Sequence, residues 1–175
     1  MKYIKLWLVI LFMGLLETVS AQITFFEGTF EDAVAKAKKE KKYLFIDFYA
    51  DWCEPCKQMA KKIFTLPEVG EYFNKNFVCC QLNAEAPENK TLVQKYKVNA
   101  LPTLLFLNVK GEILLSINGA KESATLLHEA KVVMGEVLSF EKLYEKVKKE
   151  KNSDINYHIG TMIEIPRAAL TADDI

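Results

Sequence analysis

The sequence lacks an excess of charge of either sign, because 23 Lys and Arg residues balance 23 Asp and Glu residues. Without a basic surplus or long runs of one sign, no nucleic-acid-binding patch is indicated. Seven glycines and five prolines among 175 residues exclude a fibrous or low-complexity chain. Four cysteines are too few to staple a small scaffold, yet they suffice for a redox or metal site. The composition therefore predicts one compact soluble domain.

No apolar run at the start of the chain is long enough to span a membrane. The uninterrupted run from Leu6 to Leu16 has eleven residues, whereas a spanning helix needs about 18–20. The run follows Lys2 and Lys5 and precedes Val19-Ser20-Ala21, whose small residues suit a signal peptidase. We therefore expect residues 1–21 to be an export signal, cleaved after Ala21, rather than a membrane anchor. Since no cysteine lies near the cut, we expect an exported, periplasmic protein without stable membrane insertion.

Hydrophobic periodicity predicts alternating helices and strands along the remaining chain. Thr29 followed by Asp32 is typical of a helix N-cap, so we expect a helix from Phe30. The run from Tyr43 to Ala50 is apolar almost throughout and too short for a buried helix, which favours a strand covered on both faces. Further strands are expected over 23–26 and 77–82, and a hairpin is expected from 103–109 and 112–117 around Lys110-Gly111. Further helices are expected after Cys56, from Pro67, over 87–96 and over 122–137. This order predicts an α/β fold with a central mixed sheet and helices on both faces.

The end of the chain is less regular. Residues 139–151 are highly charged with an apolar stripe, which predicts one more helix. Residues 152–175 mix apolar residues with a polar end, and we expect peripheral docking or disorder there. The expected organisation is an export signal over 1–21, one domain over 22–138, and a C-terminal helix with a tail over 139–175.

The strongest chemical signal is the pair Cys53 and Cys56 at the predicted strand-to-helix junction. Residues three apart lie on adjacent turns of one helix face, within reach of a disulfide. The first N–H groups of a helix lack partners and its dipole favours negative charge, so Cys53 is expected to have a lowered pKa and to act as a thiolate nucleophile. Pro55 suits the first helical turn.

Two other interpretations of the cysteines stay open. A purely structural disulfide is one, although a loop of four residues restrains little unfolded-state entropy. A zinc site is the other, but it needs two more ligands, and His128 and His158 lack ligand spacing. Cys79 and Cys80 are adjacent, so on a strand they point to opposite faces, and we expect two buried thiols. No metal is therefore expected.

Asp47 is the second residue with chemical potential. It stands within an apolar run, where burial should raise its pKa. It precedes Cys53 by six residues on the strand that leads to the Cys turn, so it could accept the proton of Cys56. The alternative is an aspartate at a strand end that bonds to backbone groups.

Several segments resemble the thioredoxin family. Ile46 to Lys57 is similar to the thioredoxin active-site segment, and Asn99 to Thr103 resembles the family's cis-proline loop. Lys110-Gly111-Glu112 through Gly119-Ala120 resembles its closing hairpin. The match to the family covers about Ile23 to Leu138 in consistent order. The string Tyr49-Ala50-Asp51-Trp52-Cys53 is also similar to the periplasmic thioredoxin-like domain of DsbD-type transmembrane thiol reductases.

This resemblance implies a role for each matching residue. Cys53 corresponds to the attacking cysteine, Cys56 to the resolving cysteine and Asp47 to the buried acid. Pro102, which by itself marks only the start of a strand, corresponds to the cis-proline that faces the disulfide. The expected substrate groove is lined by Trp52, Ala100, Leu101, Pro102, Gly119 and Ala120.

The sequence departs from the family pattern at three positions. Glu54 replaces the usual glycine and puts a negative charge beside the nucleophile. Lys61 replaces a helix-kinking proline found in many members. Gln81 replaces a lysine that pairs with the buried acid, and we expect this loss to raise the pKa of Asp47 further.

We therefore expect a monomeric thiol–disulfide oxidoreductase that reduces exported protein disulfides without a metal or organic cofactor. The resemblance implies a transmembrane thiol carrier as electron donor, and the sequence does not choose among substrates. Two alternatives stay open: a binding module whose CxxC forms only a stabilising disulfide, and a disulfide isomerase, which normally requires dimerisation.

Overall fold

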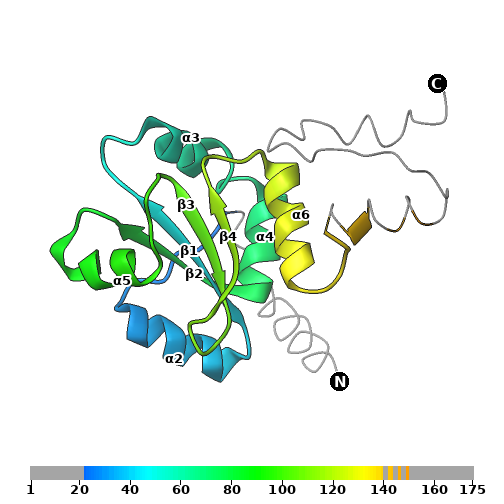
Figure 1. Ribbon diagram of the computed structural model, residues 1–175, viewed down its shortest axis with the longest axis horizontal. Coiled ribbons are helices and arrows are strands. Elements are labelled where there is room, and N and C mark those ends of the chain that lie inside the picture. Colours follow the sequence, from blue (N-terminus) through cyan, green and yellow to red (C-terminus); the bar gives the residue numbers. More distant parts are fainter. Residues whose placement is uncertain (1–21, 140–141, 144–145, 147–148, 150–175) are drawn as a thin grey trace, which may run out of the picture. The chain divides into compact units, whose positions relative to one another are not determined.

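The computed structural model describes residues 22–139, 142–143, 146 and 149. The chain divides into two compact units, residues 1–137 and residues 138–175. The strands and helices labelled in Figure 1 belong to the first unit. The expected export signal and the expected tail over 152–175 lie outside the described residues, as does most of the helix expected over 139–151.

Within the described residues, four strands form one mixed sheet in the order β2-β1-β3-β4. β1 (Tyr43–Tyr49) pairs in parallel with β2 (Phe77–Asn83) and antiparallel with β3 (Thr103–Leu107). β3 in turn pairs antiparallel with β4 (Ile113–Asn118). The predicted mixed sheet and hairpin are confirmed, and β1 lies inside the sheet with a partner on each side.

Helices cover both faces of this sheet, as predicted (Figure 1). One face packs against α2 (Phe30–Glu40) and α5 (Lys90–Lys95). The other face packs against α3 (Glu54–Lys62), α4 (Pro67–Asn76) and α6 (Ser123–Val133). The resulting three layers enclose two hydrophobic cores, one on each side of the sheet.

β1 contributes to both cores because its side chains alternate between the two faces. Leu44, Ile46 and Phe48 belong to the core beneath α2 and α5. Phe45 belongs to the opposite core, where its ring centroid lies 4.8 Å from that of Phe73. These side chains have no exposure to solvent. Because burial of one large apolar side chain contributes roughly 1.5–3 kcal/mol, β1 has to be apolar almost throughout.

α2 begins where the sequence predicts. The Thr29 hydroxyl oxygen accepts a hydrogen bond from the backbone N–H of Asp32 (3.1 Å), and the Asp32 carboxylate accepts one from the backbone N–H of Thr29 (3.3 Å). This reciprocal capping box satisfies N–H groups that the first turn would leave unpaired. The helix ends at Glu40, and the C-cap residue Lys41 has a left-handed backbone (φ 56°) and donates its N–H to carbonyl oxygens of the last turn.

Two predicted helices are shorter in the structure. The helix expected over 87–96 is divided into a 3₁₀ turn, η1 (Pro87–Asn89), and α5. The helix expected over 122–137 ends at Val133. Gly135 follows with a φ of 74°, a left-handed conformation that commonly ends helices and that glycine adopts without strain.

The connection between β3 and β4 is longer than the predicted two-residue turn. β3 ends at Leu107 and β4 begins at Ile113. The Asn108 side-chain oxygen accepts hydrogen bonds from the backbone N–H groups of Lys110 (2.8 Å) and Glu112 (3.1 Å). The Asn108 backbone N–H also donates to the carbonyl oxygen of Glu112 (3.0 Å), and its carbonyl oxygen accepts from the backbone N–H of Gly111 (2.9 Å), so the side chain supplements the backbone hydrogen bonds of this loop.

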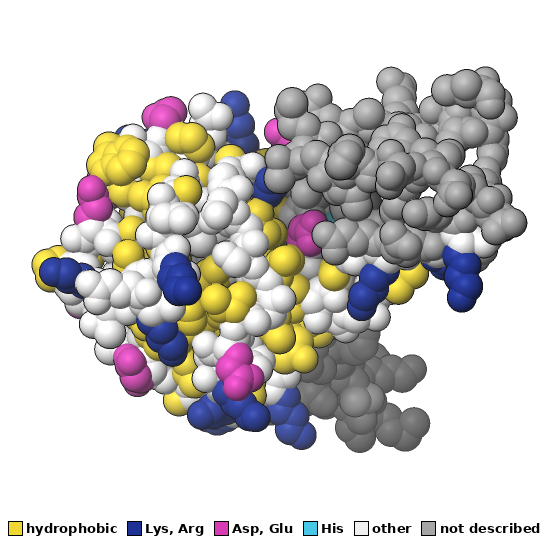
Figure 2. Space-filling model, viewed as in Figure 1, with side chains coloured by type: hydrophobic (Ala, Val, Ile, Leu, Met, Phe, Trp, Pro, Cys, Tyr) yellow, Lys and Arg dark blue, Asp and Glu magenta, His cyan; other side chains and the backbone are white. Residues whose placement is uncertain are grey.

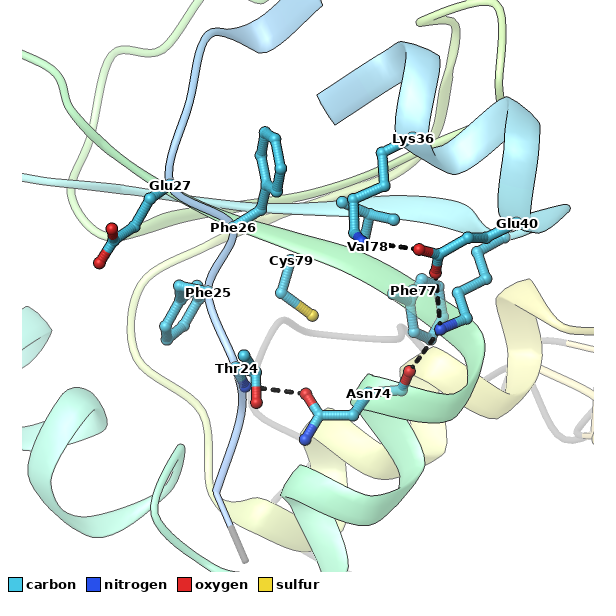
Figure 3. A pocket seen from close by; sticks show the side chains of 11 residues that line it. Thr24, Phe25, Phe26, Glu27, Lys36, Glu40, Asn74, Phe77, Val78 and Cys79 are labelled. Atoms are coloured by element: carbon cyan, nitrogen blue, oxygen red, sulfur yellow. Dashed lines mark hydrogen bonds and ion pairs between the residues drawn. The ribbon is translucent and has the colours of Figure 1, made fainter. Parts of the chain in front are cut away.

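The first described residues run along the outer edge of β2 (Figure 3). The strand expected over 23–26 is reduced to a single parallel bridge between Phe25 and Cys79. The Asn74 amide donates to the carbonyl oxygen of Gln22 (2.8 Å), and its oxygen accepts from the backbone N–H of Thr24 (2.8 Å). A pocket of about 330 Å³ lies between this segment, α2 and β2.

Gly70 allows the same segment to approach α4 closely. A Cβ atom at this position would lie 2.5 Å from the backbone carbonyl carbon of Gln22. A Cβ atom cannot lie this close to a backbone atom. Glycine is therefore required here because a side chain has no room, and not because of the backbone dihedral angles.

Gly70→Ala should therefore destabilise the protein. In an unhindered helix, alanine is more stable than glycine by about 1 kcal/mol. Here we expect a loss of about 1–3 kcal/mol, because the new Cβ displaces the Gln22 backbone. Urea unfolding measures the change, and Asn74→Ala serves as comparison because it removes the two hydrogen bonds without crowding. A Gly70→Ala variant more stable than the wild type would contradict the close approach.

Candidate functional site

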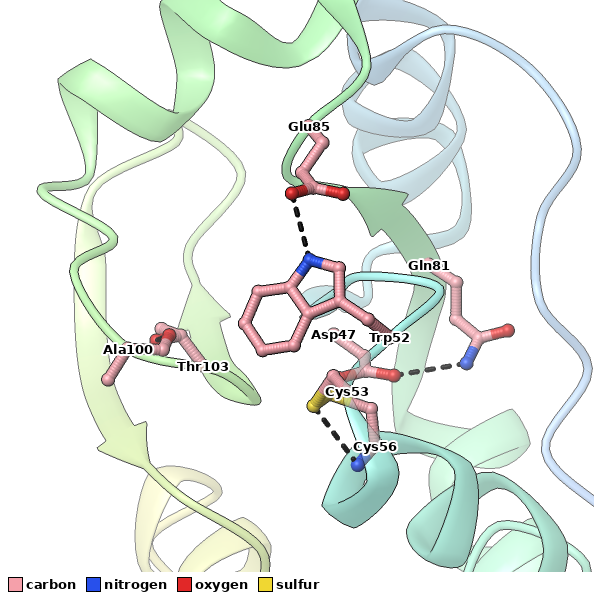
Figure 4. The surroundings of a disulfide bond; sticks show 8 residues. All are labelled: Asp47, Trp52, Cys53, Cys56, Gln81, Glu85, Ala100 and Thr103. Carbon is pink, nitrogen blue, oxygen red and sulfur yellow. Dashed lines mark hydrogen bonds between the residues drawn. A yellow bond between two sulfur atoms is a disulfide. The ribbon is translucent and has the colours of Figure 1, made fainter.

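The cysteine pair lies at the junction of β1 and α3 (Figure 4). Cys53 and Cys56 form a disulfide, and their Cα atoms are 5.3 Å apart. Cys53 is the N-cap residue of α3, and its Sγ accepts a hydrogen bond from the backbone N–H of Cys56 (3.3 Å). Pro55 stands in the first turn, where its missing N–H leaves no helical hydrogen bond unmade. The pair therefore lies between a strand and a helix, as the sequence predicts.

This position favours negative charge on the Cys53 sulfur. The first N–H groups of α3 have no partner within the helix, and the helix dipole adds partial positive charge there. In the reduced chain, the Cys56 N–H that donates to Sγ can donate to a thiolate at the same place. Glu54 is exposed in the same first turn and opposes that charge.

Little of the disulfide reaches solvent. Only 2% of Cys53 and 4% of Cys56 is exposed. Ala50 packs with the two cysteines, and Tyr49 and Leu101 pack against this small cluster. These side chains therefore cover most of the two sulfurs.

Two loops at the same end of the sheet, one before β3 and one after β4, border this cover. The Leu101–Pro102 peptide bond is cis. The backbone N–H of Gly119 donates to the carbonyl oxygen of Pro102 (2.8 Å), so the two loops are joined. The Thr103 hydroxyl donates to the carbonyl oxygen of Ala100 (2.7 Å), which closes the turn. The structure thus brings Leu101, Pro102 and Gly119, predicted as groove residues, to one place.

Asp47 lies in the interior on β1, with only 1% of its surface exposed. By strand alternation it faces the same side as Phe45, the side that α3 covers. Burial raises the pKa of Asp47 from 3.8 to about 6, against a lowering by the hydrogen bond from Gln81. Its Oδ1 has no hydrogen-bond partner among the described residues.

Gln81 has a role that the sequence analysis did not predict. Its Nε2 donates to Asp47 Oδ2 at 3.0 Å, and the two residues are paired across β1 and β2. The expectation that the pKa of Asp47 rises because a lysine is lost considered only the missing charge. The glutamine keeps a hydrogen bond to the carboxylate, and this bond lowers the pKa of Asp47.

Trp52 is the most exposed large hydrophobic residue of the described chain, with 67% of its surface exposed. Its indole Nε1–H donates to Glu85 Oε1 at 2.8 Å (Figure 4). Glu85 follows β2, and its place at the site was not predicted from the sequence. The signal that could have found it is topological, because the carboxyl ends of two parallel strands meet at one edge of the sheet.

Cys79 and Cys80 are buried free thiols, as predicted. They belong to opposite cores of the sheet. Burial raises the pKa of Cys80 to about 11. Burial is also the main cause of the raised pKa of Cys79, and the neighbouring Cys80 is the second cause. Both thiols therefore stay protonated and are poor nucleophiles. Among the described residues, no group of three or more His, Cys, Asp or Glu could hold a metal, and His158 lies outside them.

Residues 30–132 match the family model described as a thioredoxin-like domain. Since the match covers more than half of the 175 residues, this chain belongs to the thioredoxin-like family. Among the described residues, no helix is both long and apolar enough to cross a bilayer.

Known relatives are named for thiol–disulfide chemistry. The chain is 42% identical over 65 residues to the thiol:disulfide interchange protein DsbD of Haemophilus influenzae, over 36% of this chain and 11% of that protein. It is 40% identical over 68 residues to thioredoxin-T of Drosophila melanogaster, over 39% of this chain and 40% of that one. The chain thus corresponds to 11% of the length of the DsbD relative. These names support the predicted enzyme class, thiol–disulfide oxidoreductase.

Solved structures share the fold. A Bacteroides thetaiotaomicron protein, described as a proposed disulphide-isomerase, is 38% identical with a TM-score of 0.59, covering 66% of this chain and 95% of that one. The oxidised C-terminal domain of Neisseria meningitidis DsbD is 24% identical with a TM-score of 0.52, covering 62% and 97%. The predicted α/β thioredoxin fold is confirmed.

The raised pKa of Asp47 predicts a pH-dependent stability. Because the folded chain binds this proton more tightly than the unfolded chain, the contribution is complete below about pH 4 and is lost as the pH rises through about 6. Between these limits, the free energy of unfolding of the oxidised wild type should fall by about 3 kcal/mol relative to Asp47→Asn. Urea unfolding at several pH values measures this difference.

Asp51→Asn is the matched control, because Asp51 is exposed and the chemical change is the same. Its pH profile should follow the wild type. Parallel profiles for the wild type and Asp47→Asn would show that burial does not perturb Asp47.

Proposed function

We propose that this protein reduces disulfides of exported proteins by exchange with its Cys53–Cys56 dithiol. The Cys53 thiolate attacks one sulfur of the substrate disulfide, so an intermolecular S–S bond forms and the other substrate sulfur leaves as a thiolate. Cys56 loses its proton and attacks the Cys53 sulfur, which forms the internal disulfide and releases the second substrate sulfur. Two electrons pass from the dithiol to the substrate, and this exchange requires neither a metal nor an organic cofactor.

The observation that carries the proposal is the N-cap position of Cys53. The Cys56 N–H already donates to Cys53 Sγ at 3.3 Å, so a donor for the thiolate is in place. A purely structural role explains the disulfide less well. The loop that it closes joins residues only three apart, so the bond restrains the unfolded chain only slightly and adds little stability.

Asp47 acts in the proposal as the proton acceptor for Cys56. Its carboxylate is buried on the side of the sheet that α3 covers, with a pKa of about 6. Near neutral pH, Asp47 is therefore a more effective proton acceptor than a carboxylate with an ordinary pKa. Since Oδ1 has no partner among the described residues, one oxygen of Asp47 is available for a proton.

Trp52, Leu101, Pro102 and Gly119 form the docking groove in this proposal. Leu101 packs against the disulfide, and Gly119 is hydrogen-bonded to Pro102. An extended segment lying along these loops would bring its own disulfide to the Cys53 sulfur. Holding the two reacting sulfurs in the correct orientation lowers the activation free energy of a bimolecular exchange substantially.

We propose a periplasmic setting on the basis of the sequence. The segment over 1–21 has the pattern of an export signal cleaved after Ala21, which supports a periplasmic location. A reductase in an oxidising compartment needs electrons, and relatives named DsbD favour a transmembrane thiol carrier as the donor. We propose that the protein acts as a monomer.

Cys56→Ser tests the exchange reaction. Without the resolving thiol, Cys53 should form a stable mixed disulfide with a defined peptide disulfide, in about one copy for each protein molecule. Mass spectrometry under non-reducing conditions measures the adduct, and partners captured in cells are then identified. Cys53→Ser is the control, because Cys79 and Cys80 are buried and should not react.

The outcomes separate the candidate functions. No adduct with Cys56→Ser would contradict exchange and favour a binding module with a structural disulfide. Net rearrangement of a scrambled protein without loss of its disulfides, together with a dimer in sedimentation, would favour an isomerase.

The direction of exchange is tested by the reduction potential. Glu54 destabilises the Cys53 thiolate, so the potential should lie nearer that of thioredoxin (about −270 mV) than that of DsbA (about −120 mV). Glu54→Gln should raise it by about 10 mV, because an exposed charge has a small effect. Equilibration with glutathione measures both values, and Glu71→Gln on α4 is the control. A wild-type potential above about −200 mV would contradict a reductase.

A further inference from the structure

Trp52 is held in an exposed position that the fold itself does not need. Two thirds of its surface is in contact with solvent (67%), and it belongs to neither large hydrophobic core. Its indole is nevertheless fixed, because Nε1–H donates to Glu85 Oε1 at 2.8 Å. A large aromatic side chain that is both exposed and fixed is typical of a contact surface.

The loop that carries Glu85 is itself well anchored. The backbone N–H of Ala84 donates to the carbonyl oxygen of Tyr49 (2.8 Å), which extends the pairing of β2 with β1. The Asn83 side-chain oxygen accepts from the backbone N–H of Glu85 (2.9 Å), and Asn89 donates to the carbonyl oxygen of Asn83 (2.9 Å). The backbone of Glu85 is therefore fixed at the rim of the site before any partner arrives.

The charge around Trp52 is negative. Asp51, Glu54 and Glu85 are all exposed, and Lys57 is the first of three exposed lysines that follow along α3. Figure 2 shows a hydrophobic patch at the upper left with acidic side chains on two sides. The face of an indole attracts cations, and nearby carboxylates add to the same attraction.

We propose that Glu85 determines specificity in the docking groove, by holding the Trp52 indole and by selecting substrate disulfides that are flanked by lysine or arginine. This inference rests on the proposed exchange function and adds the chemical class of the substrate segment. A basic side chain beside the substrate cysteine would lie over the Trp52 ring and near the Glu85 carboxylate, whereas an acidic one would be repelled.

Three peptide disulfides of equal length test this proposal, with Lys, Gln or Glu next to the cysteine. The pre-reduced protein is mixed with each peptide in a single turnover, and the released peptide thiol is quantified after an acid quench. At low ionic strength, the wild type should react roughly three- to tenfold faster with the Lys peptide than with the Glu peptide. This ratio should decline in about 0.5 M salt, because the groups are exposed.

Three variants separate charge from position. Glu85→Gln retains an oxygen that accepts from Trp52 Nε1 but removes the charge, so it should reduce the Lys-to-Glu ratio to about half of the wild-type value or less. Glu85→Ala also releases the indole and should slow the reaction with every peptide. Glu71→Gln changes the same charge on the exposed face of α4 and should keep the ratio of the wild type.

The outcomes distinguish this inference from the function on which it rests. A wild-type ratio near one, or a ratio that Glu85→Gln leaves unchanged, would overturn the role of Glu85 while exchange itself stands. Failure to reduce all three peptides would overturn the proposed exchange function, and the role of Glu85 with it.

Discussion

The burial of β1 on both faces is the constraint on which the rest of the structure depends. Because β1 has a strand on each side and helices above and below, its side chains must fill both cores and its register is fixed. The end of the strand therefore delivers Cys53 to one point, where α3 begins. The same register carries Asp47 into the interior, so the strand that positions the sulfurs also creates the buried carboxylate.

Local patterns were enough to predict most of the fold. The start of α2 depends on two side chains three residues apart, and β1 is defined by its continuous apolar run, so both were predicted from sequence. The loop between β3 and β4 was not, because the Asn108 side chain adds hydrogen bonds to the backbone N–H groups of Lys110 and Glu112 that strand patterns do not predict. The strand expected over 23–26 became one bridge because Asn74 takes the N–H of Thr24.

The candidate site divides in the same way. The cysteine pair and Asp47 follow one another along a single strand, loop and helix, so sequence alone could assemble them. Glu85 lies 33 residues from Trp52, and their hydrogen bond exists only because β2 pairs in parallel with β1. Gln81 was considered only as a lost positive charge, whereas the register of the two strands makes it a hydrogen-bond donor to Asp47. Residues brought together by strand pairing need the register, which a single sequence does not provide.

The geometry separates reactivity from recognition. The sulfurs are almost fully covered, and the charge on Cys53 responds mainly to groups within the first turn of α3. Trp52 and Glu85 stand in solvent, where screening weakens their effect on the sulfur but leaves them free to meet a partner. In the proposed exchange, rim charges would therefore change which disulfides are bound with little change in reduction potential. Glu54 belongs to both groups, since it is exposed on the rim and lies in the first turn that stabilises the thiolate.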